Sequence, residues 1–154
     1  MVIAILALVA LAIVLFEQAQ GGSDTVADLG GRVNTSDTSQ VEKIAQAIAT
    51  AEGFYAVGSR PQRNHNPGDM TADLVGASTG TDGMFVVYGN DQDGWNNLYA
   101  QINAWLNGTS KHAGPTSTIA DVSKFYTTTE QDSWAANVAG HLGVSVETEL
   151  GQIV

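Results

Sequence analysis

The stretch AEGFYAVGSRPQRNHNPGDM, residues 51–70, is the most informative part of this chain. The segment before it has one apolar face at helical spacing, made of Val41, Ile44, Ala45 and Ile48. One turn further along that face comes Glu52, on the side that otherwise looks inward. Gly53 follows, then an aromatic pair and an Arg-Asn-His-Asn-Pro-Gly turn. The sequence therefore predicts a buried helix that ends in a single acidic residue.

A glutamate in that place has two physical reasons to stay protonated near neutral pH. It faces the negative end of the helix dipole, and an apolar neighbourhood disfavours its charged form, so both effects raise its pKa. A general acid needs a carboxyl group of this kind. We therefore interpret Glu52 as a candidate catalytic acid, with Phe54 and Tyr55 as walls of a substrate pocket. The alternative is a solvated glutamate at a frayed helix end.

The composition of the chain argues against some classes of partner and ligand. It has 154 residues, no cysteine, 16 acidic and only 6 basic residues, and a net charge of -10. Nucleic acid is not an expected partner, because nonspecific binding requires Lys and Arg to neutralise phosphates. Without cysteine there is no thiolate metal site, and His112 and His141 are isolated and show no ligand spacing. We expect no metal ion and no cofactor. His65 is expected to be exposed rather than catalytic.

The first sixteen residues, MVIAILALVALAIVLF, contain no polar side chain. A helix of that length spans roughly 24 Å, just short of a typical hydrocarbon core, and local thinning closes such a gap. We predict a transmembrane anchor over residues 1–17, a flexible linker over 18–38 and a compact domain over 39–154. A cleaved signal peptide is the alternative, but the basic start typical of one is missing.

Four helices are predicted in the domain. Three of them cover residues 39–51, 91–106 and 118–126. The fourth follows Thr128, whose spacing to Gln131 is typical of a capping box, and Gly143 is placed to end it. Residues 84–88 (MFVVY) form a β-rich run bounded by glycines. The expected fold class is mostly α, an α+β domain with a small β and loop insert.

Several side chains are compatible with two roles. In the turn, Arg63, Asn64 and Asn66 either hydrogen-bond a substrate or only shape the chain, since Asn and Pro-Gly form turns in any context. Tyr126 either faces a groove or packs in the core. Three tryptophans lie on apolar helical faces and are expected in the core, namely Trp95, Trp105 and Trp134.

Four segments, in order, resemble the lysozyme-like peptidoglycan-cleaving domains of phages and bacteria, the lytic transglycosylase and muramidase superfamily. AIATAEGFY (47–55) resembles the end of the family's first helix, and RNHNPGDM (63–70) is similar to its R-N-N-N-P-G-N-[IL] loop. FVVYGNDQDGWNNLYAQI (85–102) is similar to its F-x-x-Y-x-x-x-x-x-G-W-x-x-L segment, and residues 118–144 resemble its closing helices. The resemblance covers nearly all of residues 40–150. Asp69 departs from it, because the family pattern has Asn there.

The resemblance implies a groove that binds alternating N-acetylglucosamine and N-acetylmuramic acid, with Glu52 protonating the glycosidic oxygen. With such a substrate, the residues expected to bind it are Phe54, Tyr55, Arg63, Asn64, Asn66 and Tyr126. Lytic transglycosylases need no second carboxylate, because the muramyl 6-hydroxyl or N-acetyl group completes the reaction and leaves a 1,6-anhydro product. A hydrolase more often uses one about 5 to 9.5 Å away. Candidates for it are Asp69, Asp73, Asp82, Asp91 and Asp93. We favour the transglycosylase.

These observations together favour a membrane-anchored enzyme that cuts peptidoglycan glycan strands. Its setting is either the internal membrane of a virion, with virion proteins as partners, or a bacterial inner membrane with the domain on the wall side. Two alternatives remain open. One is a non-catalytic structural or glycan-binding protein of a virion or envelope that retains the fold. The other is an endolysin for host lysis, released by an N-terminal signal-arrest segment.

Overall fold

The computed structural model describes residues 35–154. The predicted membrane anchor (1–17) and residues 18–34 of the predicted linker lie outside the described residues. Within the part that is described, no helix is both long and apolar enough to cross a membrane.

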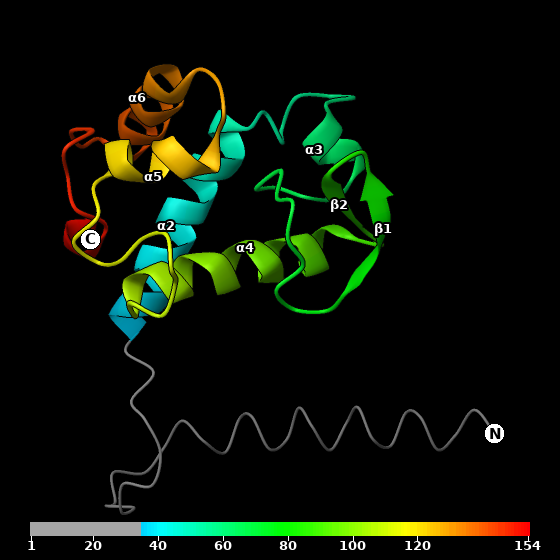
Figure 1. Ribbon diagram of the computed structural model, residues 1–154, viewed down its shortest axis with the longest axis horizontal. Helices are drawn as coiled ribbons and strands as arrows, with labels where there is room; N and C mark the ends of the chain where they lie inside the picture. Colours follow the sequence, from blue (N-terminus) through cyan, green and yellow to red (C-terminus); the bar gives the residue numbers. More distant parts are fainter. Residues whose placement is uncertain (1–34) are drawn as a thin grey trace, which may run out of the picture. The chain divides into compact units, whose positions relative to one another are not determined.

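The described chain is mostly helical and carries one small sheet, which confirms the predicted α+β class (Figure 1). Its helices are α2 (Thr35–Ala51), α3 (Arg60–Arg63), α4 (Asp91–Leu106), α5 (Ile119–Tyr126) and α6 (Gln131–Leu142), followed by a 3-10 turn, η2 (Leu150–Gln152). Its strands are β1 (Ser78–Asp82) and β2 (Phe85–Tyr88). In Figure 1, α2, α5 and α6 lie on one side, α3 and the two strands on the other, and α4 runs along both.

The helix boundaries follow the sequence pattern closely. The helix predicted over 91–106 is confirmed at both ends, and α2 begins four residues before the predicted start at residue 39. Helix α5 begins after Thr118, whose hydroxyl accepts from the N–H of Asp121 at 3.1 Å. The Asp121 carboxylate in turn accepts from the Thr118 N–H at 3.2 Å. A capping box therefore fixes the start of α5.

The capping box predicted at Thr128 and Gln131 is wrong. Helix α6 begins at Gln131, directly after Glu130, which adopts a left-handed conformation with φ 57°. The amide Nε2 of Gln131 donates to the carbonyls of Lys124 and Thr127, so this side chain closes the α5–α6 loop instead of capping the helix. Gly143, with φ 70°, ends α6 as predicted.

The β-rich run over 84–88 forms the second strand of an antiparallel hairpin. Asp82 pairs with Phe85, so Met84 lies in the two-residue turn and not in the strand. The buried strand residues Val86 and Tyr88 donate their N–H groups to the carbonyls of Met70 and Asn64, both at 2.9 Å. The hairpin is therefore bonded directly to the Asn-Pro-Gly turn.

The hydrophobic core lies where α2 packs against α4 and α6. The predicted stripe of α2 is buried, as shown by Val41, Ile44, Ala45 and Ile48. Trp105 and Trp134 are core residues, exposed by 1% and 6%. Trp95 is partly buried and packs against the core from outside. The core prediction is thus confirmed for two of the tryptophans and in part for Trp95.

Candidate active site

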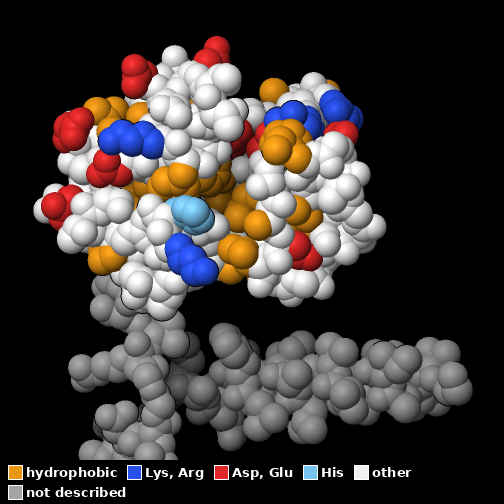
Figure 2. All heavy atoms as spheres, in the orientation of Figure 1, with side chains coloured by type: hydrophobic (Ala, Val, Ile, Leu, Met, Phe, Trp, Pro, Cys, Tyr) orange, Lys and Arg blue, Asp and Glu red, His pale blue; other side chains and the backbone are white. Residues whose placement is uncertain are grey.

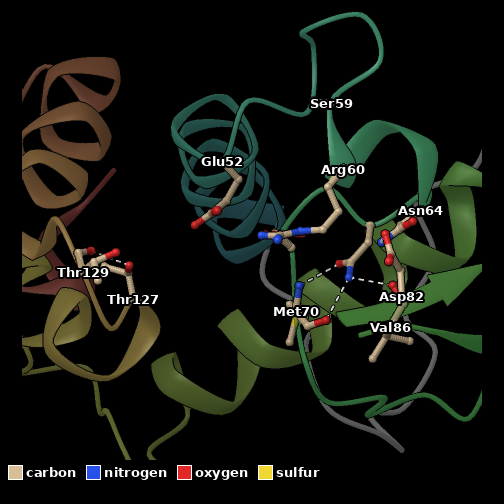
Figure 3. A network of polar contacts seen from close by, with 12 residues as sticks. Glu52, Ser59, Arg60, Asn64, Met70, Asp82, Val86, Thr127 and Thr129 are labelled. Atoms are coloured by element: carbon tan, nitrogen blue, oxygen red, sulfur yellow. Dashed lines mark hydrogen bonds and ion pairs between the residues drawn. The ribbon is translucent and has the colours of Figure 1, made fainter. Parts of the chain in front are cut away.

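Glu52 comes directly after the last residue of α2 and lines a pocket of about 550 Å³. In Figure 3 its carboxylate points into the space between the α5–α6 loop, which carries Thr127 and Thr129, and the segment that carries Arg60 and Met70. Figure 2 shows this face of the molecule hollowed between two lobes, with apolar side chains gathered along the hollow. The glutamate is half-buried and opens to this pocket, so it is not the solvated residue of the alternative interpretation.

Both sides of the hollow contribute to the pocket lining. The α5–α6 side supplies Phe125, Tyr126, Thr127, Thr128 and Thr129, and α4 and the chain after it supply Gln101 and His112. The opposite side supplies Arg60, Gly68, Asp69, Met70, Thr71, Ala72, Met84 and Phe85. The lining therefore mixes apolar faces with hydroxyl groups and one ion pair.

One aromatic side chain, Trp134, bonds the Glu52 carboxylate, and a second, Tyr126, packs against Trp134. The indole Nε1 of Trp134 donates to its Oε1 at 2.7 Å. The ring of Tyr126 lies 4.9 Å from that of Trp134, and its hydroxyl donates to the Gly68 carbonyl at 2.7 Å. A Cβ on Gly68 would come within 2.8 Å of this hydroxyl, so a larger residue there would displace Tyr126. The two aromatic residues therefore link the helical side of the site to the turn.

The environment of Glu52 raises its pKa from 4.5 to about 7. Burial is the largest cause, since it disfavours the charged form, and the nearby Asp69 acts in the same direction. The hydrogen bond from Trp134 and the positive charge of Arg60 act in the opposite direction and lower the pKa. Near neutral pH the group is therefore present in both its acid and its base form.

Arg60 and Asp69 form an ion pair on the side of the pocket that faces the α5–α6 loop. Arg60 Nε donates to Asp69 Oδ1 at 3.0 Å, and its Nη2 donates to Oδ2 of the same carboxylate. The Asp69 side chain is only 6% exposed, whereas that of Arg60 is 42% exposed. The Cζ atom of Arg60 lies 3.4 Å from the centre of the Phe85 ring. Two hydrogen bonds and an aromatic face thus hold the guanidinium group.

The three predicted residues of the turn have structural partners. Asn66 is fully buried; its Nδ2 donates to the carbonyls of Met70 and Val86, and its Oδ1 accepts from the Met70 N–H, all at 2.9 Å. Asn64 Nδ2 donates to Asp82 at 3.4 Å, and Arg63 donates to the Gly58 carbonyl. None of the three lines the pocket at Glu52. Of the two roles compatible with the sequence, the structure shows the one that shapes the turn.

Phe54 and Tyr55 also lie away from the pocket lining. Phe54 is buried and packs edge-on against Trp95, with ring centres 5.6 Å apart. Tyr55 is 54% exposed and lies edge-on to Phe54 at 5.4 Å. Phe54 and Tyr55 therefore do not line the space around the Glu52 carboxylate. That they bind a glycan strand stays a prediction. Tyr126, by contrast, both lines the pocket and packs against the core.

The turn also approaches α4 without space for a side chain. A Cβ built on Gly94 would lie 1.9 Å from the carbonyl oxygen of His65 and 2.8 Å from Cδ of Pro67. His65 itself is partly exposed and its Nδ1 contacts the Asp91 carboxylate at 2.6 Å. Helix α4 therefore supports the turn that carries Asp69.

Among the five aspartates proposed as a second carboxylate, only Asp69 lines this pocket. Asp73 accepts four backbone N–H groups, from Val75, Gly76, Ala77 and Ser78. Its hydrogen bonds to Ser78 are the main cause that lowers its pKa to about 2. Asp82 and Asp91 lie beside Asn64 and His65, and Asp93 caps the start of α4 with Asn90. Across residues 35–154, no group of three or more His, Asp or Glu side chains is arranged to hold a metal ion.

No family model, no curated protein and no solved structure matches this chain.

Proposed function

We propose that residues 39–154 form a lysozyme-like domain that cleaves the bond between N-acetylmuramic acid and N-acetylglucosamine in peptidoglycan. Glu52 is its single general acid and base. The observation that supports this most directly is the place of Glu52, a half-buried carboxyl group with a pKa of about 7 on the wall of an open pocket. The pocket volume of about 550 Å³ lies within the range of small-ligand sites.

The two forms of Glu52 suit the two proton transfers of a lytic transglycosylase. In its acid form it gives a proton to the glycosidic oxygen as the bond from C1 to that oxygen breaks. The resulting carboxylate accepts the 2.7 Å hydrogen bond from Trp134. It then takes the proton of the muramyl 6-hydroxyl while that oxygen bonds to C1, which gives a 1,6-anhydro end. A pKa close to the working pH serves both steps.

The pairing of Asp69 favours this chemistry over hydrolysis. A hydrolase that uses a second carboxylate needs one free to act on water or on the sugar. Asp69 is the one aspartate in this pocket, and both of its oxygens accept hydrogen bonds from Arg60. Each Asp69 oxygen is thus paired with a cation and its side chain is only 6% exposed, which favours Glu52 as the active carboxyl group.

The remaining lining suits a sugar chain. Phe125 and Tyr126 offer aromatic surface to the apolar faces of sugar rings, and Met84 and Phe85 offer apolar surface on the other side. The hydroxyls of Thr128 and Thr129 can bond sugar hydroxyls and N-acetyl groups. The Thr127 hydroxyl donates to the Thr129 carbonyl at 2.6 Å and can still accept a hydrogen bond.

We further propose that residues 1–17 anchor this domain in a membrane beside its polymer. In a virion with an internal membrane, such an enzyme would open the wall locally during genome entry. In a bacterial inner membrane it would remodel the wall from the wall-facing side. The apolar run without a polar side chain supports the anchor.

The test uses the full chain in detergent micelles with purified peptidoglycan sacculi. Wild type should release soluble muropeptides with 1,6-anhydro ends. Glu52→Gln keeps an oxygen for the Trp134 hydrogen bond but cannot give up a proton, so release should fall about 100-fold or more. Glu42→Gln changes an exposed residue of the same helix outside the pocket and should keep full activity.

Two results would refute the proposal in different ways. If wild type binds sacculi and releases nothing, the domain is a non-catalytic glycan-binding protein. If Glu52→Gln remains fully active, the assigned role of Glu52 is wrong.

A further inference from the structure

The proposed mechanism gives no proton-transfer step to the charged pair in the pocket, Arg60 with Asp69. Both residues line the same pocket as Glu52, and both influence its pKa. Asp69 is a second carboxylate in the pocket of Glu52, and hydrolases use a second carboxylate to activate water at a sugar centre. The pocket thus contains two carboxyl groups, as a hydrolase site does, and the guanidinium group of Arg60 is bonded to one of them.

Asp69 cannot easily leave its place. Its backbone is left-handed, with φ 46°, and its N–H donates to the Asn66 carbonyl at 2.9 Å. The preceding Gly68 is enclosed, since an added Cβ would meet Tyr126 and Leu98 within 3 Å. The turn therefore fixes the backbone of Asp69, and Arg60 orients its carboxylate.

Arg60 is held independently of Asp69. It is the first residue of α3, whose start is capped by the Ser59 hydroxyl, and its guanidinium lies over the Phe85 ring. The cation–π contact and the position of Arg60 at the start of α3 orient its guanidinium N–H groups toward the Asp69 carboxylate. Arg60 donates a charge-assisted hydrogen bond to each Asp69 oxygen, and the Asp69 side chain is only 6% exposed, so little of the carboxylate is open to water while Arg60 is present.

We propose that Arg60 determines the outcome of the reaction by withholding Asp69 from water, so that the sugar closes on its own 6-hydroxyl instead of being hydrolysed. This inference rests on the proposed function and adds to it the residue that decides between the two products. Arg60 acts through Asp69 and is a positioning residue.

The two outcomes differ only in the second half of the reaction. In wild type, the 6-hydroxyl oxygen bonds to C1 and its proton goes to the Glu52 carboxylate. Without the cation, a water oxygen bonds to C1 and the water proton goes to Asp69, which leaves a free reducing end. In both cases the leaving oxygen has already received its proton from Glu52. The 6-hydroxyl returns a proton to Glu52 directly, whereas after hydrolysis Asp69 releases its proton to solvent and Glu52 regains one from solvent, so atoms and charges balance.

The experiment measures the ratio of reducing to 1,6-anhydro ends released from sacculi by the full chain in detergent. Arg60→Gln should raise this ratio at least about tenfold, because a positioned general base contributes about 100-fold or more to water attack. The double variant Arg60→Gln with Asp69→Asn removes the freed carboxylate and should return the ratio to that of wild type. A loss of packing alone would not be reversed by the second substitution.

Lys124→Gln is the matched control. It removes the same charge from an ion pair, with Asp121 at 2.8 Å, on an exposed face of α5 outside the pocket. Its product ratio should equal that of wild type. Circular dichroism and thermal unfolding establish that each variant is folded. If Arg60→Gln does not fold, Arg60→Lys takes its place, since Lys keeps the charge but not the two-point fork, and should raise the ratio by a smaller factor.

A folded Arg60 variant that still gives only anhydro ends overturns the inference. So does a wild type that already gives mainly reducing ends, or a double variant that keeps the raised ratio. Absence of any soluble product from wild type is a different result, because it removes the proposed function itself.

Discussion

The indole Nε1 of Trp134 donates a 2.7 Å hydrogen bond to Oε1 of Glu52. This bond joins the first turn of α6 to the end of α2 and is directed at the carboxylate that faces the pocket. Burial, the largest effect, disfavours the charged form of Glu52 and raises its pKa to about 7, whereas the bond from Trp134 stabilises that form and limits the rise. The indole N–H of Trp134, a core residue, therefore lowers the pKa of the Glu52 carboxyl group.

Trp134→Phe should move the pH dependence of the reaction to higher pH. The hydrogen bond lowers the Glu52 pKa, so its loss should raise that pKa further and keep the acid form present for about one more pH unit. The alkaline limb of kcat/KM on soluble glycan fragments reports this value. Trp95→Phe, at a partly buried position outside the pocket, serves as control. An unmoved limb in Trp134→Phe would contradict the assigned role of the bond.

Glu52→Gln should stabilise the protein at alkaline pH and leave its stability unchanged in acid. The folded-state pKa of about 7 exceeds the ordinary 4.5, so the folded state favours the protonated form. Below about pH 4.5 the group is neutral in both states, and above pH 7 the folded state must hold a charge. The variant should therefore gain up to about 3 kcal/mol at pH 8 and little at pH 4. Urea unfolding at the two pH values checks this, and equal effects at both would refute it.

Asn66→Ala should lower the free energy of unfolding by about 3 kcal/mol. The substitution leaves the Met70 N–H and the Met70 and Val86 carbonyls without their partner in a buried place. Asn103→Ala, which removes one exposed bond to the Tyr99 carbonyl, should change stability by no more than about 0.5 kcal/mol. Chemical unfolding of both variants measures the difference. Similar values for the two would show that the buried amide does not hold the turn.

Gly68→Ala should cost about 1 to 3 kcal/mol of stability and displace Tyr126. The added methyl would meet the Tyr126 hydroxyl at 2.8 Å and Leu98 Cδ1 at 2.9 Å. Gly140→Ala is the opposite case: it lies in α6 with nothing within 4 Å, and should stabilise the helix by about 0.5 to 1 kcal/mol. Thermal unfolding compares the two. A Gly68→Ala protein as stable as wild type would mean that Tyr126 moves away without cost.

The spacing of apolar residues in the sequence was sufficient to predict the position of Glu52 at the end of α2, but it did not predict which side chains surround it. The apolar period of α2 continues to the glutamate, and the ends of α4 follow from its own residues. Trp134 lies 82 positions from Glu52, and an indole on an apolar stripe looks the same whether or not its N–H has a partner. Arg60 belongs to a four-residue helix too short for any periodicity. These contacts arise from packing between distant segments, which spacing does not encode.

The failed capping box at Thr128 has a similar origin. The pattern of residue types was present, but the left-handed backbone at Glu130 directs the Gln131 side chain to the α5–α6 loop. The turn was also predicted from its residue types alone. The buried side-chain amide of Asn66 donates to the backbone carbonyls of Met70 and Val86 and does not line the pocket. Residue types indicate which chemistry is available, and backbone geometry decides where it is directed.

The close approach of α4 to the turn at Gly94 bears on how more distant relatives of this chain can be recognised. An added Cβ would lie 1.9 Å from the His65 carbonyl oxygen, so no other residue type permits the same packing. Asparagine and Pro-Gly occur in turns of many proteins and discriminate poorly between ancestries. A glycine aligned with Gly94, in register with such a turn, is the more selective criterion, because a steric requirement maintains it independently of the reaction that the pocket performs.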